Sequence, residues 1–234
     1  MIKLNHKSKR LLLLQRNELL SDKQKWLRRK FGRFLFTNLL INFSQNKDIE
    51  KITGELFQKE IDIIRSYLPA KAENIIDIGC GLGIINIFLN KIYNNKTNFY
   101  LLDKNRIDSK IRYGFSSNYE SYNDLNETKK LLVDNNISKD NIQTINVESE
   151  IIIDQKIDLV ISLKSMGYHY PLDEYLGLFN DCCKKDTTFI FDVTEGYYDK
   201  SLLKKYFEEV EIIYEEKSIH SLKRVCCKKF NLLK

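Results

Sequence analysis

The chain has 234 residues, 43% of them hydrophobic and 30% charged, a balance typical of a globular protein with one sizeable core. Its two prolines and nine glycines argue against collagen-like repeats, Pro-rich disorder and most all-β sandwiches. Residues 1–34 contain eleven Lys or Arg and two acids, a net charge of +9, whereas the rest of the chain sums to −3. The basic character of the chain therefore belongs to its N-terminal segment.

The first part of the chain predicts helices. From Leu11 to about Leu68 the apolar residues recur at helical spacing, which indicates two or three helices. Ser21 is the expected N-cap of a helix over Lys23–Phe43. The polar stretch Ser44–Asp48 predicts a break, and Pro69 ends the helix that follows it.

After Pro69, short apolar runs alternate with helical stretches. The predicted strands are Ile75–Ile78, Phe99–Leu102, Ile142–Val147, Leu159–Leu163, Phe189–Val193, Val210–Tyr214 and Val225–Phe230. The predicted helices are Ile84–Tyr93, Leu125–Asn135, Tyr175–Lys184 and Ser201–Phe207. This alternation predicts an α/β fold with a doubly wound, mostly parallel, seven-stranded sheet.

The last two predicted strands have no helix between them. They are joined by Glu215–Leu222, which indicates an antiparallel pair at one edge of the sheet. We accordingly divide the chain into a basic helical extension over residues 1–69 and an α/β domain over residues 70–234.

The segment from Asn74 to Gly83 (NIIDIGCGLG) carries the strongest functional signal, because an apolar strand runs into three glycines and then an apolar helix. Gly79, Gly81 and Gly83 allow the backbone to turn sharply and to approach a ligand closely. The following helix adds free N–H groups at its start. This arrangement predicts a ligand-binding turn.

Two acids define the kind of ligand. Asp103 ends the second predicted strand, twenty residues past Gly83, where an acid typically binds ribose hydroxyls. Asp77 lies two residues before the first glycine, and its charge disfavours a pyrophosphate and favours a cationic ligand. S-adenosylmethionine has a sulfonium, an ammonium and no phosphate, and so it fits better than a dinucleotide.

With these residues the sequence resembles the class I S-adenosylmethionine-dependent methyltransferases, whose first motif is D-x-G-x-G-x-G. Residues 77–83 match that motif completely, and Asp103 falls where the family places its ribose-binding acid. The resemblance covers about residues 70–230. It implies a Rossmann-like methyltransferase fold, S-adenosylmethionine as the cofactor and methyl transfer as the activity.

The resemblance also implies further contacts with the cofactor. A polar residue after the third strand usually lies near the adenine amine, and Asn146 or Glu148 fits that description. Cys80 within the motif, Lys104 after the ribose acid and Ser162 at the end of the fourth strand complete the predicted cofactor set. A solvated loop position is an equally good interpretation of Asn146 and Glu148.

The acceptor site is expected after the fourth strand, in the segment from Ser162 to Pro171 (SLKSMGYHYP). The D/N-P-P-Y/F motif of enzymes that methylate amino groups or adenine is absent there, which argues against base N-methylation. His169, between Tyr168 and Tyr170, is the best candidate to accept a proton from a hydroxyl acceptor, and we assign these three residues to catalysis. A loop histidine bonded to the backbone is the competing interpretation.

Between the second and third strands lies an excess segment, Tyr113–Tyr122, that mixes aromatic residues with Ser and Asn. Such residues suit a saccharide or another polar ring, because flat apolar faces are combined with hydrogen-bonding edges. Packing against the N-terminal helices is the alternative. With the acceptor segment, this insert is similar to a loosely defined group of candidate bacterial sugar O-methyltransferases.

The basic run Lys23–Arg33 has three interpretations: a site for an anionic substrate or lipid surface, an RNA-binding face, or a solvated helix face. In the resembling family an N-terminal helical segment commonly covers the acceptor or forms a dimer contact. Peripheral membrane contact through residues 1–43 would fit a lipid-linked saccharide as acceptor. RNA would favour a basic surface around the pocket itself, yet the rest of the chain is slightly acidic.

The five cysteines predict reduced thiols, because they include two adjacent pairs and no C-x-x-C unit. No metal ligands are assigned, since adjacent cysteines are poorly placed to share one tetrahedral ion. Reduced thiols favour the cytoplasm. The longest apolar stretch, Phe34–Phe43, is shorter than the roughly 20 residues of a membrane span, so no transmembrane segment is expected. No signal peptide is indicated either.

The sequence thus predicts a cytoplasmic S-adenosylmethionine-dependent methyltransferase that acts on a hydroxyl of a small molecule, with a sugar unit as one option. An RNA methyltransferase that grips RNA with its N-terminal helices is the second hypothesis. A non-catalytic interaction module on the same fold is the third.

Overall fold

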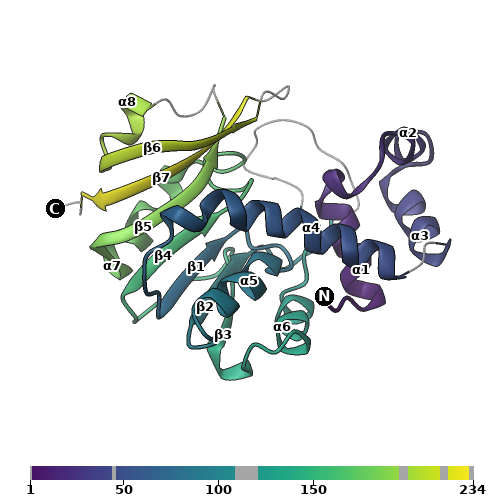
Figure 1. The fold of residues 1–234 in the computed structure, drawn as a ribbon, viewed down its shortest axis with the longest axis horizontal. Coiled ribbons are helices and arrows are strands. Elements are labelled where there is room, and N and C mark those ends of the chain that lie inside the picture. The colour runs from purple at the N-terminus through teal and green to yellow at the C-terminus, as the bar shows by residue number, and fades with distance from the viewer. Residues whose placement is uncertain (1, 44–45, 109–120, 195–199, 217–220, 232–234) are drawn as a thin grey trace.

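The computed structural model describes residues 2–43, 46–108, 121–194, 200–216 and 221–231. Its helices are α1 (His6–Gln15), α2 (Asp22–Phe31), α3 (Arg33–Phe43), α4 (Asn46–Ile64), α5 (Ile84–Ile92), α6 (Leu125–Asp134), α7 (Leu176–Cys182) and α8 (Lys200–Leu203). Its strands are β1 (Asn74–Ile78), β2 (Asn98–Asp103), β3 (Ile142–Asn146), β4 (Ile157–Ser162), β5 (Cys183–Val193), β6 (Phe207–Glu216) and β7 (Leu222–Phe230). Figure 1 shows the strands as one sheet with helices in front of and behind it.

The seven strands have the order β3-β2-β1-β4-β5-β7-β6. Strands β3 to β5 pair in parallel, whereas β7 is antiparallel to both of its neighbours. The predicted doubly wound, mostly parallel α/β sheet is therefore confirmed, and so is the antiparallel pair at one edge. The carboxyl ends of β1, β2 and β4 lie side by side at the centre of the sheet.

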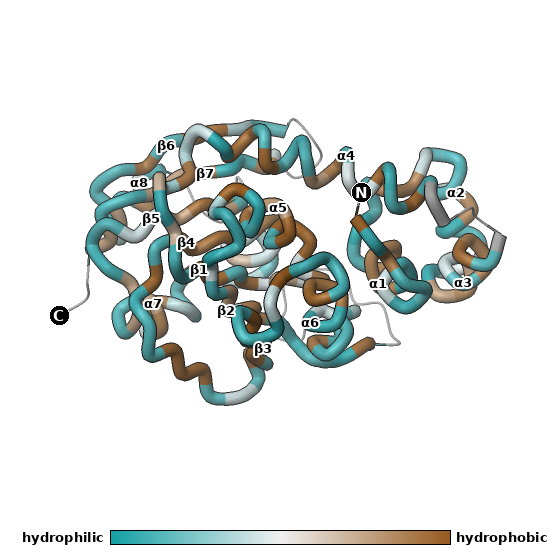
Figure 2. The backbone as a smooth tube through the Cα atoms, turned by 60° about the horizontal axis from the view of Figure 1, so that its bottom comes forward, coloured by the Kyte–Doolittle hydropathy of each residue, from teal (hydrophilic) through white to brown (hydrophobic). Residues whose placement is uncertain are grey.

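Strand residues alternate between two apolar cores because successive side chains point to opposite faces. On β1, Ile75 packs into the core under α4 and α5, whereas Ile76 and Ile78 pack into the core on the other face with Phe179 of α7. In Figure 2 brown stretches lie on inner strands such as β1 and β4, as expected for strands that are covered on both faces, whereas the edge strand β6 is largely teal.

The N-terminal region contains one more helix than expected among the described residues. Ser21 is the N-cap as predicted, and it forms a capping box with Gln24. The single predicted helix over Lys23–Phe43 is wrong, because Gly32 adopts φ 81° and divides it into α2 and α3. The predicted polar break is also too long, since α4 already begins at Asn46.

The C-terminal helices are shorter than predicted. The helix predicted for Ser201–Phe207 ends at Leu203, and Phe207 instead begins β6. The helix predicted to reach Lys184 ends at Cys182, because β5 begins at Cys183 and is much longer than the predicted strand. Thr187 explains the early start of β5, since its hydroxyl donates to the Ile157 carbonyl oxygen at 2.6 Å and ties the two chain segments together.

Polar side chains fasten α1 to the α/β part. The Ser8 hydroxyl and the Asn5 amide both donate to Glu127 Oε1 on α6, at 2.5 and 2.7 Å. Lys9 is almost fully buried and forms an ion pair with Glu50 of α4 at 3.1 Å. Part of the N-terminal positive charge is therefore internal. The division at residue 69 stays a prediction.

Four of the five cysteines are buried, Cys80 is half-buried, and all five thiols are free. Most of the predicted insert Tyr113–Tyr122 lies outside the described residues; of it, Tyr122 is buried, and its ring lies 5.8 Å from that of Phe34.

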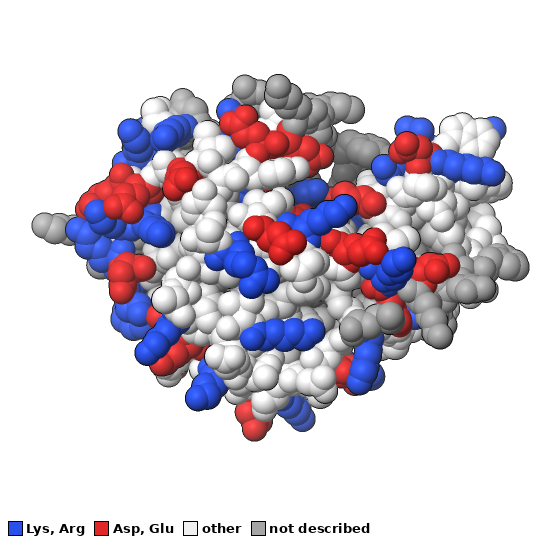
Figure 3. All heavy atoms as spheres, viewed as in Figure 1, with Lys and Arg blue, Asp and Glu red and all other residues white. Residues whose placement is uncertain are grey.

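Among the described residues, none of the helices combines the length and the apolar character that crossing a bilayer requires. In Figure 3 basic side chains gather over α2, whereas acidic and basic groups are mixed over the remainder of this face.

Candidate functional site

The glycine-rich turn after β1 lies against the end of β2. Gly79, Gly81 and Gly83 all have positive φ, at 66°, 53° and 66°. The amides of Gly79 and Cys80 both donate to the carbonyl oxygen of Leu102, at 2.8 and 3.1 Å. These bonds hold the turn at the carboxyl end of β1 and β2, where open α/β sheets bind their ligands.

Gly79 is in direct contact with the segment that follows β4. A Cβ at this position would lie 1.9 Å from Ser165 Oγ and 2.2 Å from Ser165 Cβ. No side chain therefore fits at Gly79 without movement of Ser165. The predicted cofactor turn and the predicted acceptor segment share a boundary at this point.

Gly81 lies under the N-terminal helix α1. A Cβ at Gly81 would lie 2.8 Å from Gln15 Oε1. The Gly81 carbonyl oxygen accepts hydrogen bonds from Asn123 Nδ2 and Thr128 Oγ1, both at 2.8 Å, and Gln15 Nε2 donates to the Tyr122 carbonyl oxygen at 2.8 Å. Residues from α1 and from the start of α6 thus cover the turn.

Asp77 is a buried acid directly below this turn. The alternation along β1 points its side chain toward α5, where Asn86 Nδ2 donates to Asp77 Oδ2 at 2.6 Å. Burial raises the pKa of Asp77 to about 7, although the Asn86 hydrogen bond and the charge of Arg16 act in the opposite direction. This carboxyl group can therefore change its charge near neutral pH.

Asp103 is the last residue of β2 and clamps the turn. Its Oδ2 accepts from the Gly81 amide and its Oδ1 from the Lys104 amide, each at 2.7 Å. Burial raises the pKa of Asp103 to about 6, against the effect of these two hydrogen bonds. Asp103, which the sequence predicts to bind ribose, therefore stabilises the conformation of the turn.

Three further predicted cofactor residues lie at the same edge of the sheet. Asn146 at the end of β3 pairs with Asp103 in the strand register. Glu148 follows it and forms an ion pair with Arg106. Lys104 is buried, and its Nζ lies 5.2 Å from the ring centroid of Tyr170. Their contacts with a cofactor stay predictions.

Ser162 has its hydroxyl committed within the protein. It donates to the Ile78 carbonyl oxygen at 2.8 Å and accepts from the Met166 amide at 2.9 Å. Ser162 therefore ties the end of β1 to the segment after β4. Its predicted contact with the cofactor stays a prediction.

The segment after β4, residues 164–170, is a compact loop, here called the acceptor loop. The Ser165 carbonyl oxygen accepts from the amides of Tyr168, His169 and Tyr170, at 3.1, 2.7 and 3.2 Å. His169 is exposed, and its ring meets that of Tyr168 edge to face at 4.6 Å. The loop thus presents the three predicted catalytic residues on a backbone fixed by Ser165.

A buried ion network supports the acceptor loop. Arg224 of β7 donates from Nε and Nη2 to the two carboxylate oxygens of Asp192, at 2.7 and 3.0 Å, and it also pairs with Glu60 of α4. Asp192 Oδ2 accepts from the Lys164 amide at 3.0 Å, at a residue with φ 64°. The side chain of Lys164 pairs with Glu18, which follows α1. The acceptor loop is thereby connected to the segment after α1, through Glu18, and to α4, through Glu60.

Sequence reasoning missed several of these residues. Asn86 could have been noticed, because it is a polar residue inside the apolar run of α5 and is fully buried. Gln15 and Glu18 gave no signal, since they reach the site from more than sixty positions away along the chain. Ser165 likewise gave none, because its role depends on the missing side chain of Gly79.

The turn fits the cofactor that the sequence predicts. Its glycines leave a cradle that a Cβ would fill, as the contacts at Gly79 and Gly81 show. Asp77 supplies a buried carboxyl group for a cation, and Asp103 supplies carboxylate oxygens at the end of β2. Acids in both places suit a cationic nucleoside and not a phosphate group.

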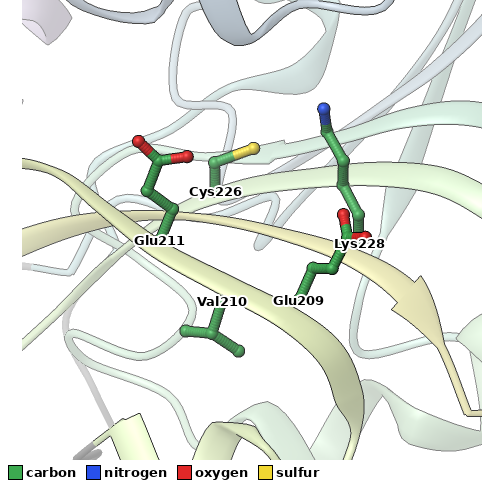
Figure 4. A pocket seen from close by; sticks show the side chains of 5 residues that line it. All are labelled: Glu209, Val210, Glu211, Cys226 and Lys228. Carbon is green, nitrogen blue, oxygen red and sulfur yellow. The ribbon is translucent and has the colours of Figure 1, made fainter.

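A hollow of about 420 Å³ lies on β7 and the edge strand β6. Figure 4 shows Glu209, Glu211, Cys226 and Lys228 on one side of these strands and Val210 on the other. This hollow is separated from β1 by other strands and carries no glycine turn. Within the described part of the chain, no three His, Cys, Asp or Glu side chains are grouped to hold a metal ion.

Comparison with solved structures shows similarity to methyltransferases. A candidate O-methyltransferase from Nostoc punctiforme is 10% identical with a TM-score of 0.54, and the match covers 78% of this chain and 58% of that one. This chain thus spans less than two thirds of that protein. An S-adenosylmethionine-dependent methyltransferase from Aquifex aeolicus is 10% identical with a TM-score of 0.49, over 73% of this chain and 89% of that one. At 10% identity the similarity to the Nostoc punctiforme protein shows the fold alone.

The family comparison covers most of the chain. A family model described as a methyltransferase domain matches residues 27–232, whereas no curated protein sequence matches. The match includes the glycine turn, Asp103 and the acceptor loop, and it extends into α2. The chain therefore belongs to this methyltransferase domain family.

Proposed function

We propose that this protein is an enzyme that transfers the methyl group of S-adenosylmethionine to a hydroxyl of a small molecule. We propose further that the acceptor is a saccharide unit. The observation that carries the proposal is the contact between Gly79 and Ser165. Through it the acceptor loop with His169 lies next to the cofactor turn. Methyl transfer requires such proximity, since the acceptor must lie in line with the reacting carbon.

When bound, S-adenosylmethionine supplies a methyl group that is activated by the positive sulfur. In the proposal Gly79, Gly81 and Gly83 shape the methionine side of its pocket. Asp77 balances positive charge there, and Asp103 binds the ribose hydroxyls while it holds the Gly81 amide. Asn146 or Glu148 lies near the adenine, and Cys80, Lys104 and Ser162 complete the pocket.

The chain has one further task, which is to remove the proton from the acceptor hydroxyl. His169 is the proposed base, because an imidazole is the side chain best suited to accept a proton at neutral pH. Its exposure on the acceptor loop gives a small molecule access to it. Tyr168 and Tyr170 flank it and offer flat apolar faces with hydroxyl groups, which suit a sugar ring.

The N-terminal helices act as a lid in this proposal. Gln15 lies over Gly81, and Glu18 forms an ion pair with Lys164 of the acceptor loop. Opening of α1 would therefore expose both halves of the site at once. We also propose that the reaction takes place in the cytoplasm, which suits the free thiols.

The test is a methyl-transfer assay with labelled cofactor and three acceptor pools: free saccharides, lipid-linked saccharides and RNA. Label should enter a saccharide pool. With that acceptor, His169→Ala should lower kcat by about a hundredfold or more with little change in cofactor affinity. His6→Ala, at an exposed histidine of α1, is the matched control and should leave kcat unchanged. Label in RNA alone, or an unchanged kcat in His169→Ala, would refute the corresponding part of the proposal.

A further inference from the structure

The helical hairpin α2–α3 forms one end of the molecule, away from the sheet (Figures 1 and 2). Its outer surface, here called the hairpin face, consists of exposed side chains on both helices. They are Asp22, Lys23, Trp26, Arg29, Lys30 and Phe31 of α2 and Leu35, Asn38, Leu39 and Asn42 of α3. We propose that the hairpin face docks this enzyme onto an anionic lipid bilayer.

Three of the exposed residues of α2 share one side of the helix. Lys23, Trp26 and Lys30 are spaced by three and four residues, so they project in nearly the same direction. The Lys30 ammonium lies 4.2 Å from the ring centroid of Trp26. An aromatic ring between lysines is suited to the boundary between lipid headgroups and acyl chains.

Two of the four exposed residues of α3 are aliphatic. Leu35 and Leu39 are separated by one helical turn and are 55% and 41% exposed. Trp26 and Phe31 of α2 are also 47% and 53% exposed. Four large apolar side chains thus face outward within fourteen residues, and a concentration of this kind marks an interaction surface.

The charge of the hairpin specifies the partner. Helices α2 and α3 contain six Lys or Arg, of which Arg28 is buried, and one acid, Asp22. In Figure 3 basic side chains accordingly gather over α2. Positive charge next to exposed leucines and aromatic rings complements an anionic membrane, in which headgroups attract the lysines and acyl chains accept the apolar groups. RNA would meet the charge and the rings but would leave the leucines exposed to water.

The inner side of the hairpin is firmly attached, so its outer side has a fixed orientation. Arg28 is buried and donates from Nη1 and Nη2 to the carbonyl oxygens of Leu13 and Leu14 at the end of α1, at 2.9 and 3.4 Å. Phe36 and Ile41 of α3 are buried in the same core as α1. The hairpin therefore presents a formed surface and does not need to fold on the membrane.

Trp26 allows a direct test, because it is the single tryptophan of the chain. The full-length protein is titrated with vesicles made of equal parts of phosphatidylglycerol and phosphatidylcholine, and with vesicles of phosphatidylcholine alone. The fluorescence of Trp26 should shift to the blue, and the protein should sediment, with the anionic vesicles only. Acyl chains brominated near the headgroup should quench the emission.

Two double variants probe the charge and the apolar groups separately. Lys23→Glu with Lys30→Glu should weaken vesicle binding by roughly tenfold or more, since each basic residue near such a surface contributes about 1 kcal/mol. Leu35→Ser with Leu39→Ser should also weaken it severalfold. The matched controls are Lys71→Glu with Lys96→Glu and Ile152→Ser, all at exposed positions away from the hairpin, and each should bind more strongly than the corresponding hairpin variant.

The proposal is overturned if the wild type gives neither a blue shift nor sedimentation with anionic vesicles. It is also overturned if the controls lose as much binding as the hairpin variants, or if RNA alone shifts the Trp26 emission. The vesicle titration involves no methyl transfer. Membrane docking and the proposed acceptor can therefore fail independently of each other.

Discussion

Substitution of Gly79 by Ala tests whether the glycine turn and the acceptor loop are in contact. The new Cβ would lie 1.9 Å from Ser165 Oγ, and the backbone would keep φ 66°. The left-handed conformation costs a residue other than Gly about 1–2 kcal/mol. Overpacking against Ser165 costs a further 1–3 kcal/mol or so. The total loss of unfolding free energy is therefore about 2–5 kcal/mol.

Gly81→Ala is the matched variant. Its φ is 53°, so the backbone cost is similar, but its Cβ would meet only the end of the flexible Gln15 side chain at 2.8 Å. We expect a loss of about 1–2 kcal/mol, mostly from the backbone. The difference between the two variants isolates the contact with Ser165.

The assay is urea unfolding of the wild type, both alanine variants, Ser165→Gly and the double variant Gly79→Ala with Ser165→Gly. If the contact is real, Ser165→Gly should relieve the overpacking, so that the double variant recovers about 1–3 kcal/mol relative to the sum of the single losses. Equal losses at Gly79 and Gly81, together with additive effects of Gly79→Ala and Ser165→Gly, would refute the reasoning.

Two further predictions concern charge. As the pH is raised toward 7, affinity for the cationic cofactor should increase by up to about tenfold per pH unit, and above pH 7 it should level off. The reason is that binding favours ionised Asp77, and the pKa of this group is raised to about 7. Calorimetry across pH 5.5 to 8.5 tests this, and Asp77→Asn should remove the part of the rise near pH 7 and leave only the part that belongs to Asp103; a flat profile in the wild type would contradict it. Arg224→Met should cost about 3–5 kcal/mol in urea unfolding, since it leaves Asp192 and Glu60 uncompensated, and a loss below about 1 kcal/mol would show that the network does not carry the expected charge.

The sheet could be predicted because its evidence is local. Each strand is a short apolar run, and the alternation with helices specifies parallel pairing. Helix boundaries were less certain where a single residue decides them. Gly32 lies within a helical pattern, and only its positive φ shows that it ends one helix and begins another. At Phe207 the burial in an aromatic cluster with Phe189 and Phe230 outweighs the local helical pattern.

The candidate site could be predicted only in part, for a similar reason. Asp77, the glycines and Asp103 follow one another at fixed spacing, so the sequence contains their relation. Ser165 and Gln15 reach the turn through tertiary packing, which no local pattern records. The sequence predicts Asp103 as a ligand of ribose, but its hydrogen bond with the Gly81 amide is seen only in the folded structure. Consequently Asp103→Ala would disturb the turn itself, and Asp103→Asn is the cleaner variant.

A suitable control for Asp103 lies at the opposite end of the parallel strands. Asp158 on β4 accepts from two backbone amides, those of Glu73 and Asn74, at 2.8 and 3.1 Å. It is similar to Asp103 in accepting from two backbone amides, but it also pairs with Lys184 at 2.6 Å and lies at the amino end of β1. Asp158→Asn reports what the loss of such a carboxylate costs where no cofactor is expected.

The most direct test of the account is calorimetric titration with S-adenosylhomocysteine of the wild type, Asp103→Asn and Asp158→Asn. We expect binding to the wild type and to Asp158→Asn with similar affinity. Binding to Asp103→Asn should be weaker by roughly tenfold or more, because a hydrogen bond to a charged group contributes about 1.5–3 kcal/mol. A folded wild type that does not bind, or equal affinity in Asp103→Asn, would contradict the assignment of the glycine turn and Asp103 as the cofactor site.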